Sequence, residues 1–95
     1  MREVVSPEEL RQCLDAISRH PKGASETGLP PSEVYGHTSQ GVRVIYINFV
    51  NPSEVPIGST YRTWVVRLGG DKSERVSYFR SRRGAAGDDT LPPDD

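Results

Sequence analysis

The chain has 95 residues, of which 34% are hydrophobic, and a formal net charge of −1. This length allows one domain with a thin core, and the chain contains no apolar run near the ~18 residues that a membrane span requires. The single cysteine, Cys13, excludes an intramolecular disulfide and a Cys/His zinc site, as is typical of a reducing compartment. We therefore expect a cytoplasmic protein with no metal and no cofactor.

The charges are unevenly distributed along the chain. All twelve Lys and Arg residues and nine of the thirteen acidic residues lie in residues 1–83. The only charged side chains in residues 84–95 are the four remaining acids. The resulting excess of basic groups in residues 1–83 is small for a nucleic-acid-binding domain. Arginine outnumbers lysine ten to two, which we interpret as the sign of a GC-rich genome of a bacterium, phage or plasmid.

Residues 2–5 have the composition of a short strand, and the clearest local signal follows them. Ser6 is a favourable N-cap, Pro7 suits the first helical position, and Glu9 completes a capping box. Pro21 ends the helix just after His20. Apolar residues recur at i, i+3, i+4 and i+7, which predicts a helix with one apolar stripe: Leu10, Cys13, Leu14 and Ile17.

The remainder of the chain predicts strands and loops. Residues 21–41 are rich in Gly, Pro and Ser and are expected to form a flexible loop, with room for a short strand at residues 33–37. Residues 42–50 are β-branched and aromatic, as in a central strand, and residues 61–68 and 74–80 form a hairpin around a turn at residues 69–73. From residue 84 onward Gly, Ala, Asp and Pro dominate, which predicts a disordered acidic tail.

These elements predict an α+β fold in which one N-terminal helix packs on a three- to five-stranded antiparallel sheet. The single domain is expected to span residues 1–83, with a flexible loop at 21–41 and a disordered tail at 84–95. A helix of about 13 residues covers only one face of such a sheet. Strand alternation places Val42, Val44 and Tyr46 on the other face, which needs the loop, a second copy of the chain or a different protein as cover. We take these three residues, with Tyr35 in the loop, as the candidate protein-binding site.

The predicted hairpin carries an alternative site for nucleic acid. One register places Trp64 opposite Tyr78 and Arg62 opposite Arg80, whereas a register shifted by two residues places Arg80 beside Trp64. Either register groups arginines around an aromatic pair, which could bind phosphates and stack bases. The competing interpretation is an aromatic pair in the core with solvated charges at the strand ends. The candidate nucleic-acid-binding residues are Arg62, Trp64, Tyr78, Arg80, Arg82 and Arg83.

A second alternative is a small ribonuclease-like hydrolase that uses His37. Its general base would be Glu33 or Glu54, and Arg43 or Arg62 would stabilise the phosphorane. The competing interpretation is a polar loop histidine, and no motif shows that these side chains converge. The favoured hypothesis is a non-enzymatic protein-binding module of inhibitor, immunity or adaptor type, with another protein or a second copy of the chain as its partner.

Overall fold

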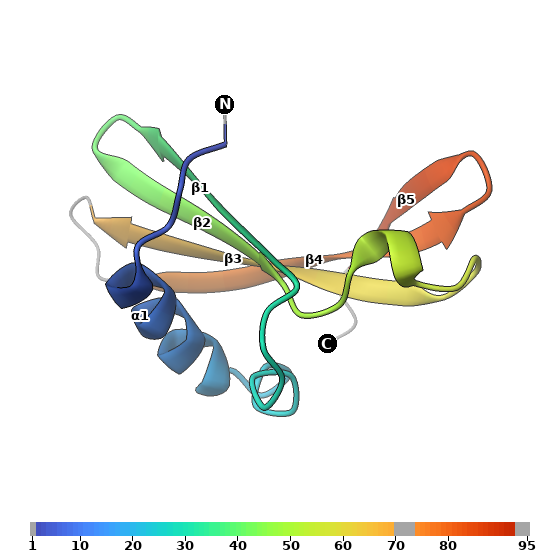
Figure 1. The fold of residues 1–95 in the computed structure, drawn as a ribbon, viewed down its shortest axis with the longest axis horizontal. Helices are drawn as coiled ribbons and strands as arrows, with labels where there is room; N and C mark the ends of the chain where they lie inside the picture. Colours follow the sequence, from blue (N-terminus) through green and yellow to red (C-terminus); the bar gives the residue numbers. More distant parts are fainter. Residues whose placement is uncertain (1, 70–73, 93–95) are drawn as a thin grey trace.

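The fold is one helix on a five-stranded antiparallel sheet, seen in a computed structural model that describes residues 2–69 and 74–92. The strands follow one another in chain order across the sheet, and α1 lies against one face near one end (Figure 1). This confirms the predicted α+β class, with the strand number at the upper end of the expected range. The elements are α1 (Pro7–Ser18), β1 (Glu33–Ser39), β2 (Val42–Asn48), the 3-10 turn η1 (Pro52–Glu54), β3 (Thr60–Gly69), β4 (Arg75–Gly84) and β5 (Gly87–Leu91).

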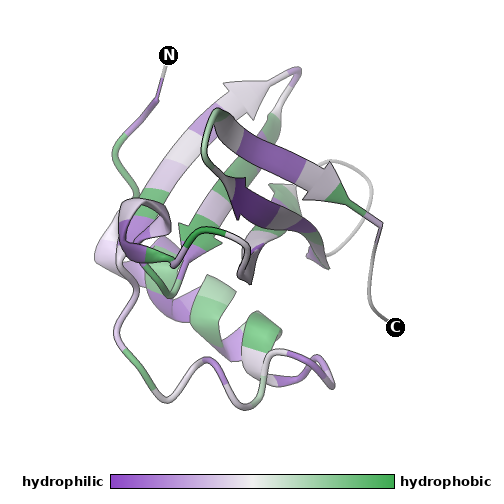
Figure 2. Cartoon of the chain, turned by 90° about the vertical axis from the view of Figure 1, so that its right-hand side faces the viewer, coloured by the Kyte–Doolittle hydropathy of each residue, from purple (hydrophilic) through white to green (hydrophobic). Residues whose placement is uncertain are grey.

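The start of α1 has the predicted capping box. Ser6 Oγ accepts a hydrogen bond from the Glu9 backbone N–H at 3.1 Å, and Glu9 Oε1 accepts one from the Ser6 N–H at 3.0 Å. These bonds satisfy N–H groups that have no partner within the helix. The helix is 12 residues long and buries its apolar stripe against the sheet. Figure 2 shows the hydrophobic segments gathered between α1 and the strands, whereas the β4–β5 hairpin is mostly hydrophilic.

The core lies between α1 and the face of the sheet that the helix covers. Its buried residues are Cys13, Ile17, Ile45, Ile47, Phe49, Trp64 and Val66. Burial raises the pKa of the Cys13 thiol to about 12, so this side chain behaves as a small apolar residue. Within the described residues, no helix has the length and apolar character that a membrane-spanning helix needs.

The β3–β4 hairpin adopts the first of the two predicted registers. Trp64 lies opposite Tyr78, and Arg62 lies opposite Arg80. The shifted register, with Arg80 beside Trp64, does not occur. The turn predicted at residues 69–73 lies, apart from Gly69, outside the described residues.

Two segments differ from the prediction because edge strands are specified by their neighbours more than by their own composition. Residues 33–39, expected as loop with room for a short strand at residues 33–37, form β1, which pairs with β2 along its full length. Residues 87–91, expected in the disordered tail, form β5 on the outer edge of β4, where Asp88 and Asp89 lie opposite Arg83 and Arg82. Opposite charges at facing positions favour this pairing, although Leu91 is the only apolar side chain of β5. The rest of the tail prediction, at residues 93–95, lies outside the described residues.

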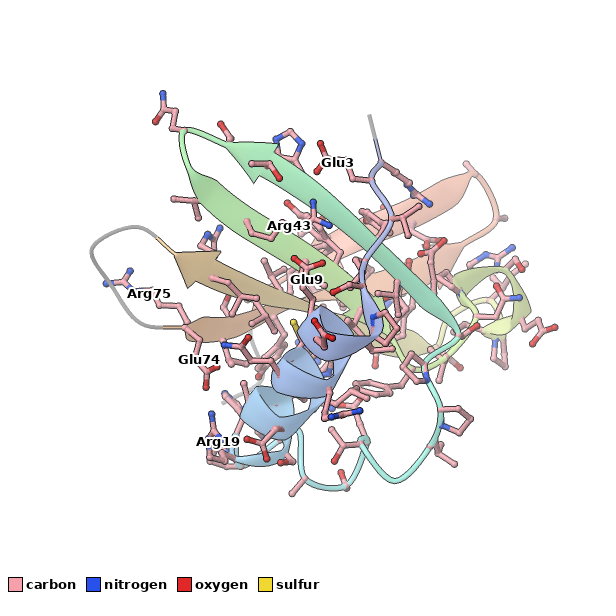
Figure 3. All side chains as sticks on the ribbon, turned by 60° about the vertical axis from the view of Figure 1, so that its left-hand side comes forward. Glu3, Glu9, Arg19, Arg43, Glu74 and Arg75 are labelled. Carbon is pink, nitrogen blue, oxygen red and sulfur yellow. The ribbon has the colours of Figure 1, made fainter. Side chains whose placement is uncertain are left out.

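The N-terminal segment is attached to the outer edge of β1 and to the sheet. Glu3 and Gly36 exchange two backbone hydrogen bonds, at 2.8 and 2.9 Å. Arg43 lies between Glu3 and Glu9 (Figure 3) and donates to both carboxylates and to the Val4 carbonyl oxygen. A Cβ at Gly36 would lie 2.7 Å from the Arg43 guanidinium, so only glycine leaves room for this arrangement.

Candidate functional site

The face of the sheet opposite α1 is the first candidate site, and we call it the open face. In Figure 1, α1 and the loop of residues 19–32 both lie below the sheet, on the side away from this face. Register and strand alternation assign all four predicted protein-binding residues to it. The open face includes Glu33, Tyr35, His37, Val42, Val44, Tyr46, Asn48, Thr63, Val65, Arg67, Arg75, Ser77 and Phe79.

The loop of residues 19–32 does not cover the open face. Gly23 is buried, and a Cβ there would clash with the Ile17 backbone. Glu26 Oε2 accepts hydrogen bonds from Trp64 Nε1 at 3.2 Å and from Arg62 Nη1 at 3.3 Å. The loop is therefore held on the helix side of the sheet, and it does not provide the cover for the other face that was one of the three alternatives considered.

The outer layer of the open face is aromatic and cationic rather than aliphatic. Val44 and Val65 are only 9% and 5% exposed, so these valines offer little surface of their own. Tyr35 and Tyr46, which face one another on β1 and β2, form a parallel stack with ring centroids 5.0 Å apart and planes at 9°. The Arg2 guanidinium carbon lies 3.9 Å from the Tyr35 centroid. Burial raises the pKa of Tyr35, so its hydroxyl stays protonated.

The Tyr35 ring is enclosed on both sides. Arg2 precedes Glu3, which pairs with the outer edge of β1, whereas Tyr46 lies on β2, at the inner edge. By this strand order the guanidinium and the second ring flank Tyr35 on opposite sides. The two flat faces of Tyr35 are therefore occupied, and its ring edge and hydroxyl are what it leaves for other contacts.

The other half of the open face adds exposed basic groups and an exposed aromatic ring. Arg67 lies directly opposite Arg75, and both are exposed. Neither forms an ion pair with an acid among residues 2–69 and 74–92. Phe79 is 39% exposed. Glu33, an acid of this face, already accepts hydrogen bonds from Arg2 and Asn48.

The structure separates the residues of the predicted nucleic-acid site. Trp64 is fully buried, and its ring packs against the edges of His20 and Tyr78, with centroids 5.1 and 5.0 Å away. Its faces are therefore not accessible to bases. Arg62, Arg80 and Arg82 project on the helix side, whereas Arg83 projects on the other side and approaches Asp88 at 3.6 Å. The aromatic pair belongs to the core because Trp64 lies opposite Ile47, on the side of the sheet that α1 covers, with Tyr78 packed against it.

The residues considered for hydrolysis are also divided between faces. His37 lies opposite Val44 on the open face, whereas Arg43 lies opposite Thr38 and projects toward α1. Arg62 is on the helix side with Glu26, and Glu54 belongs to η1. Within the described part of the chain, no group of three or more His, Cys, Asp or Glu side chains is arranged to hold a metal ion.

Three residues of the open face were missed by the sequence prediction: Arg67, Arg75 and Phe79. The signal for them was present, because the register that pairs Trp64 with Tyr78 also pairs Arg67 with Arg75. Alternation then places Phe79 on the face away from Trp64. A comparison of the chain with protein-family models, curated proteins and solved structures found no match.

Proposed function

We propose that this chain is a non-enzymatic protein-binding module, of inhibitor, immunity or adaptor type, that binds an acidic protein surface through its open face. The observation that carries the proposal is a sheet face that neither α1 nor the loop of residues 19–32 covers, and on which Phe79, Tyr35 and Tyr46 share one side with Arg67 and Arg75. Tyrosine, phenylalanine and arginine are the residues that concentrate at the centres of protein interfaces.

Charge determines the kind of partner that fits this face. Arg67 and Arg75 form no ion pair with a described acid, whereas Glu33 is already bonded. A partner that presents carboxylates around an apolar centre would complement this arrangement. A second copy of the chain, docked through the same face, would instead bring two basic surfaces together, which disfavours a homodimer at this site.

The ring geometry favours a protein over a nucleic acid at this face. Bases bind to proteins mainly by stacking on flat aromatic faces. Both faces of Tyr35 are occupied by Arg2 and Tyr46, and Trp64 is buried. Exposed ring edges and hydroxyls serve better for contacts with side chains and backbone. The separation of His37 from Arg43 and Arg62 likewise favours binding over hydrolysis.

Site-specific photocrosslinking tests this proposal. A photoreactive amino acid replaces Phe79 on the open face or, as a control, Arg11 on the exposed side of α1, and crosslinking is carried out in the cells that make the protein. We expect a protein crosslink from position 79 and none from position 11. Equal crosslinking from both positions, or crosslinking to nucleic acid from position 79, would contradict the proposal.

Affinity measurements with the purified partner then assign the contribution of each side chain. Phe79→Ala and Arg67→Ala should each weaken binding about tenfold, because truncation of an interface anchor costs on the order of 1–2 kcal/mol. Arg67→Ala should also reduce the salt dependence of association. Arg11→Ala is the matched control for Arg67→Ala and should leave the affinity unchanged.

A further inference from the structure

A pocket of about 730 Å³ lies on the helix side of the sheet, beyond the region that α1 covers. The pocket exists because α1 is shorter than the strands on which it packs. α1 has 12 residues and is ~18 Å long, whereas β3 and β4 have 10 residues each and extend ~33 Å. The uncovered end of this side is walled by the loop of residues 19–32 and by the β2–β3 connection, residues 49–59, which contribute Glu26, Glu54, Val55 and Ser59 to the lining.

The floor and the walls of the pocket differ in chemistry. Phe49 lines the pocket and is only 6% exposed, and Val55 and Pro56 extend this apolar surface. Arg62 and Arg80 line the same pocket from facing positions on β3 and β4. Arginines directly opposite one another on a sheet repel unless a negative charge balances them.

The structure balances one of these two charges. Arg62 Nη1 lies 3.3 Å from Glu26 Oε2, and its guanidinium carbon is 5.3 Å from the centre of the Tyr78 ring. Arg80 donates from Nε to the Pro92 carbonyl oxygen at 2.9 Å. Among the described residues no acid forms an ion pair with Arg80. Its two Nη groups therefore remain as donors for an anion in the pocket.

We propose that this pocket is a binding site for a small organic anion, whose carboxylate or phosphate group is held by Arg80 beside Arg62 and whose apolar body lies on Phe49. A guanidinium matches both anions by paired N–H donors. The volume lies in the range of small-molecule sites, which combine an apolar lining with a few directed polar groups. The site lies on the side opposite the open face, so it does not depend on the proposed protein-binding function.

The test is an NMR titration of the full chain, in which backbone amide signals report binding. The probes are benzoate, phenyl phosphate, the neutral analogue benzyl alcohol, and inorganic phosphate without an apolar body. We expect benzoate or phenyl phosphate to bind with roughly millimolar affinity, as ligands of this size do, and to shift the amides of residues 49–62 and of Arg80. The neutral analogue and inorganic phosphate should bind at least about tenfold more weakly. The ratio between benzoate and phenyl phosphate identifies the preferred anion.

Two variants and one control locate the site. Arg80→Gln should weaken binding of the preferred probe at least about tenfold, because a neutral amide replaces the charged donor. Ser59→Trp, which adds a large side chain to the pocket wall, should also abolish binding. This second variant keeps the test valid if Arg80→Gln does not fold. Arg11→Gln on α1 should leave binding unchanged. Benzyl alcohol binding as tightly as benzoate, no saturable shift with any probe, or an equal loss in Arg11→Gln would overturn the proposal.

Discussion

Arg43 connects three parts of the chain that are separate in sequence. It donates to Glu9 Oε2 at 2.9 Å, to the Val4 carbonyl oxygen at 2.7 Å, and to Glu3. One guanidinium thus connects β2 with the N-terminal segment and with the first turn of α1. The hydrogen bond from Arg43 lowers the pKa of Glu9, and that from the Ser6 N–H lowers it further. The same contact with Glu9 raises the pKa of Arg43.

The Glu9→Gln substitution tests this connection through pH. A carboxyl group whose pKa is lower in the folded state adds stability above its unfolded pKa, and this contribution is lost as the pH falls through the folded pKa. The wild-type protein should therefore lose stability below about pH 4.5, and Glu9→Gln should show less of this loss. At pH 7 the variant should be less stable by at most about 1 kcal/mol, since the pair is partly exposed. Urea unfolding at several pH values measures both effects.

Glu8→Gln is the matched control for this experiment, because Glu8 is its exposed neighbour in the same helical turn. It removes the same charge near the helix N-terminus without touching Arg43. Equal loss of pH dependence in the two variants would show that the helix terminus, and not Arg43, stabilises the Glu9 carboxylate.

At the level of elements, the β1–β2 hairpin contains a tight turn with an unusual residue. Ser39 pairs with Val42, which leaves Gln40 and Gly41 as the two turn residues, with φ of 52° and 77°. Two consecutive positive φ angles are typical of a type I′ turn, in which Asn-Gly is the preferred pair. Glutamine is less suited than asparagine to the left-handed conformation.

We predict that Gln40→Asn stabilises the protein by about 0.5–1 kcal/mol, because asparagine tolerates the conformation that the turn requires. Gln40→Val should be destabilising by a similar amount or more, since a β-branched residue fits this conformation poorly. Thermal unfolding at one fixed pH measures both changes. A stability of Gln40→Asn equal to or below that of the wild type would contradict this account of the turn.

Elements with local signals were predictable from the sequence, and elements specified by neighbours were not. The capping box at Ser6 and Glu9 gives α1, and the run of β-branched residues from Val42 gives β2. β1 contains Gly36 and His37, and β5 contains Asp88 and Asp89, so neither has an apolar alternation. Their pairing with β2 and β4 becomes visible only once those strands are placed.

The candidate sites also differ in how far the sequence predicts them. The shared face of Tyr35 and Tyr46 could be predicted in part, because period-two alternation fixes the side of each residue on β2. The pocket around Arg80 could not, since it depends on where α1 ends relative to β3 and on the path of residues 49–59. The burial of Trp64 depended on which side of β3 the helix covers, because the two registers considered differ by two residues and leave Trp64 on the same side.

The molecule as a whole has one core, and two of its residues report on it. Trp64, the single tryptophan, and Cys13, the single cysteine, both have 0% exposure and belong to the same cluster. A thiol with a pKa of about 12 reacts slowly with alkylating reagents, because the thiolate is the reactive form. The fluorescence of Trp64 and the reactivity of Cys13 should therefore change only when this core cluster opens.

We predict that the urea transition followed by Trp64 fluorescence coincides with the one followed by Cys13 labelling under brief reagent exposure. Coincidence of two probes is the expectation for cooperative unfolding of a small domain. Labelling of Cys13 at lower urea concentrations than the fluorescence change would instead indicate that α1 separates from the sheet before the strands unfold.

The adjacent residues Phe79 and Arg80 have a consequence for how this chain can change. Phe79 belongs to the open face and Arg80 to the pocket, and Arg62 and Thr63 on β3 are divided in the same way. The two strands thus carry two interleaved sequences, one for each side of the sheet. Substitutions can alter one side while the other stays constant, so the two surfaces are free to evolve separately. Inserting a single residue into β4 would instead exchange every side chain beyond it between the two surfaces.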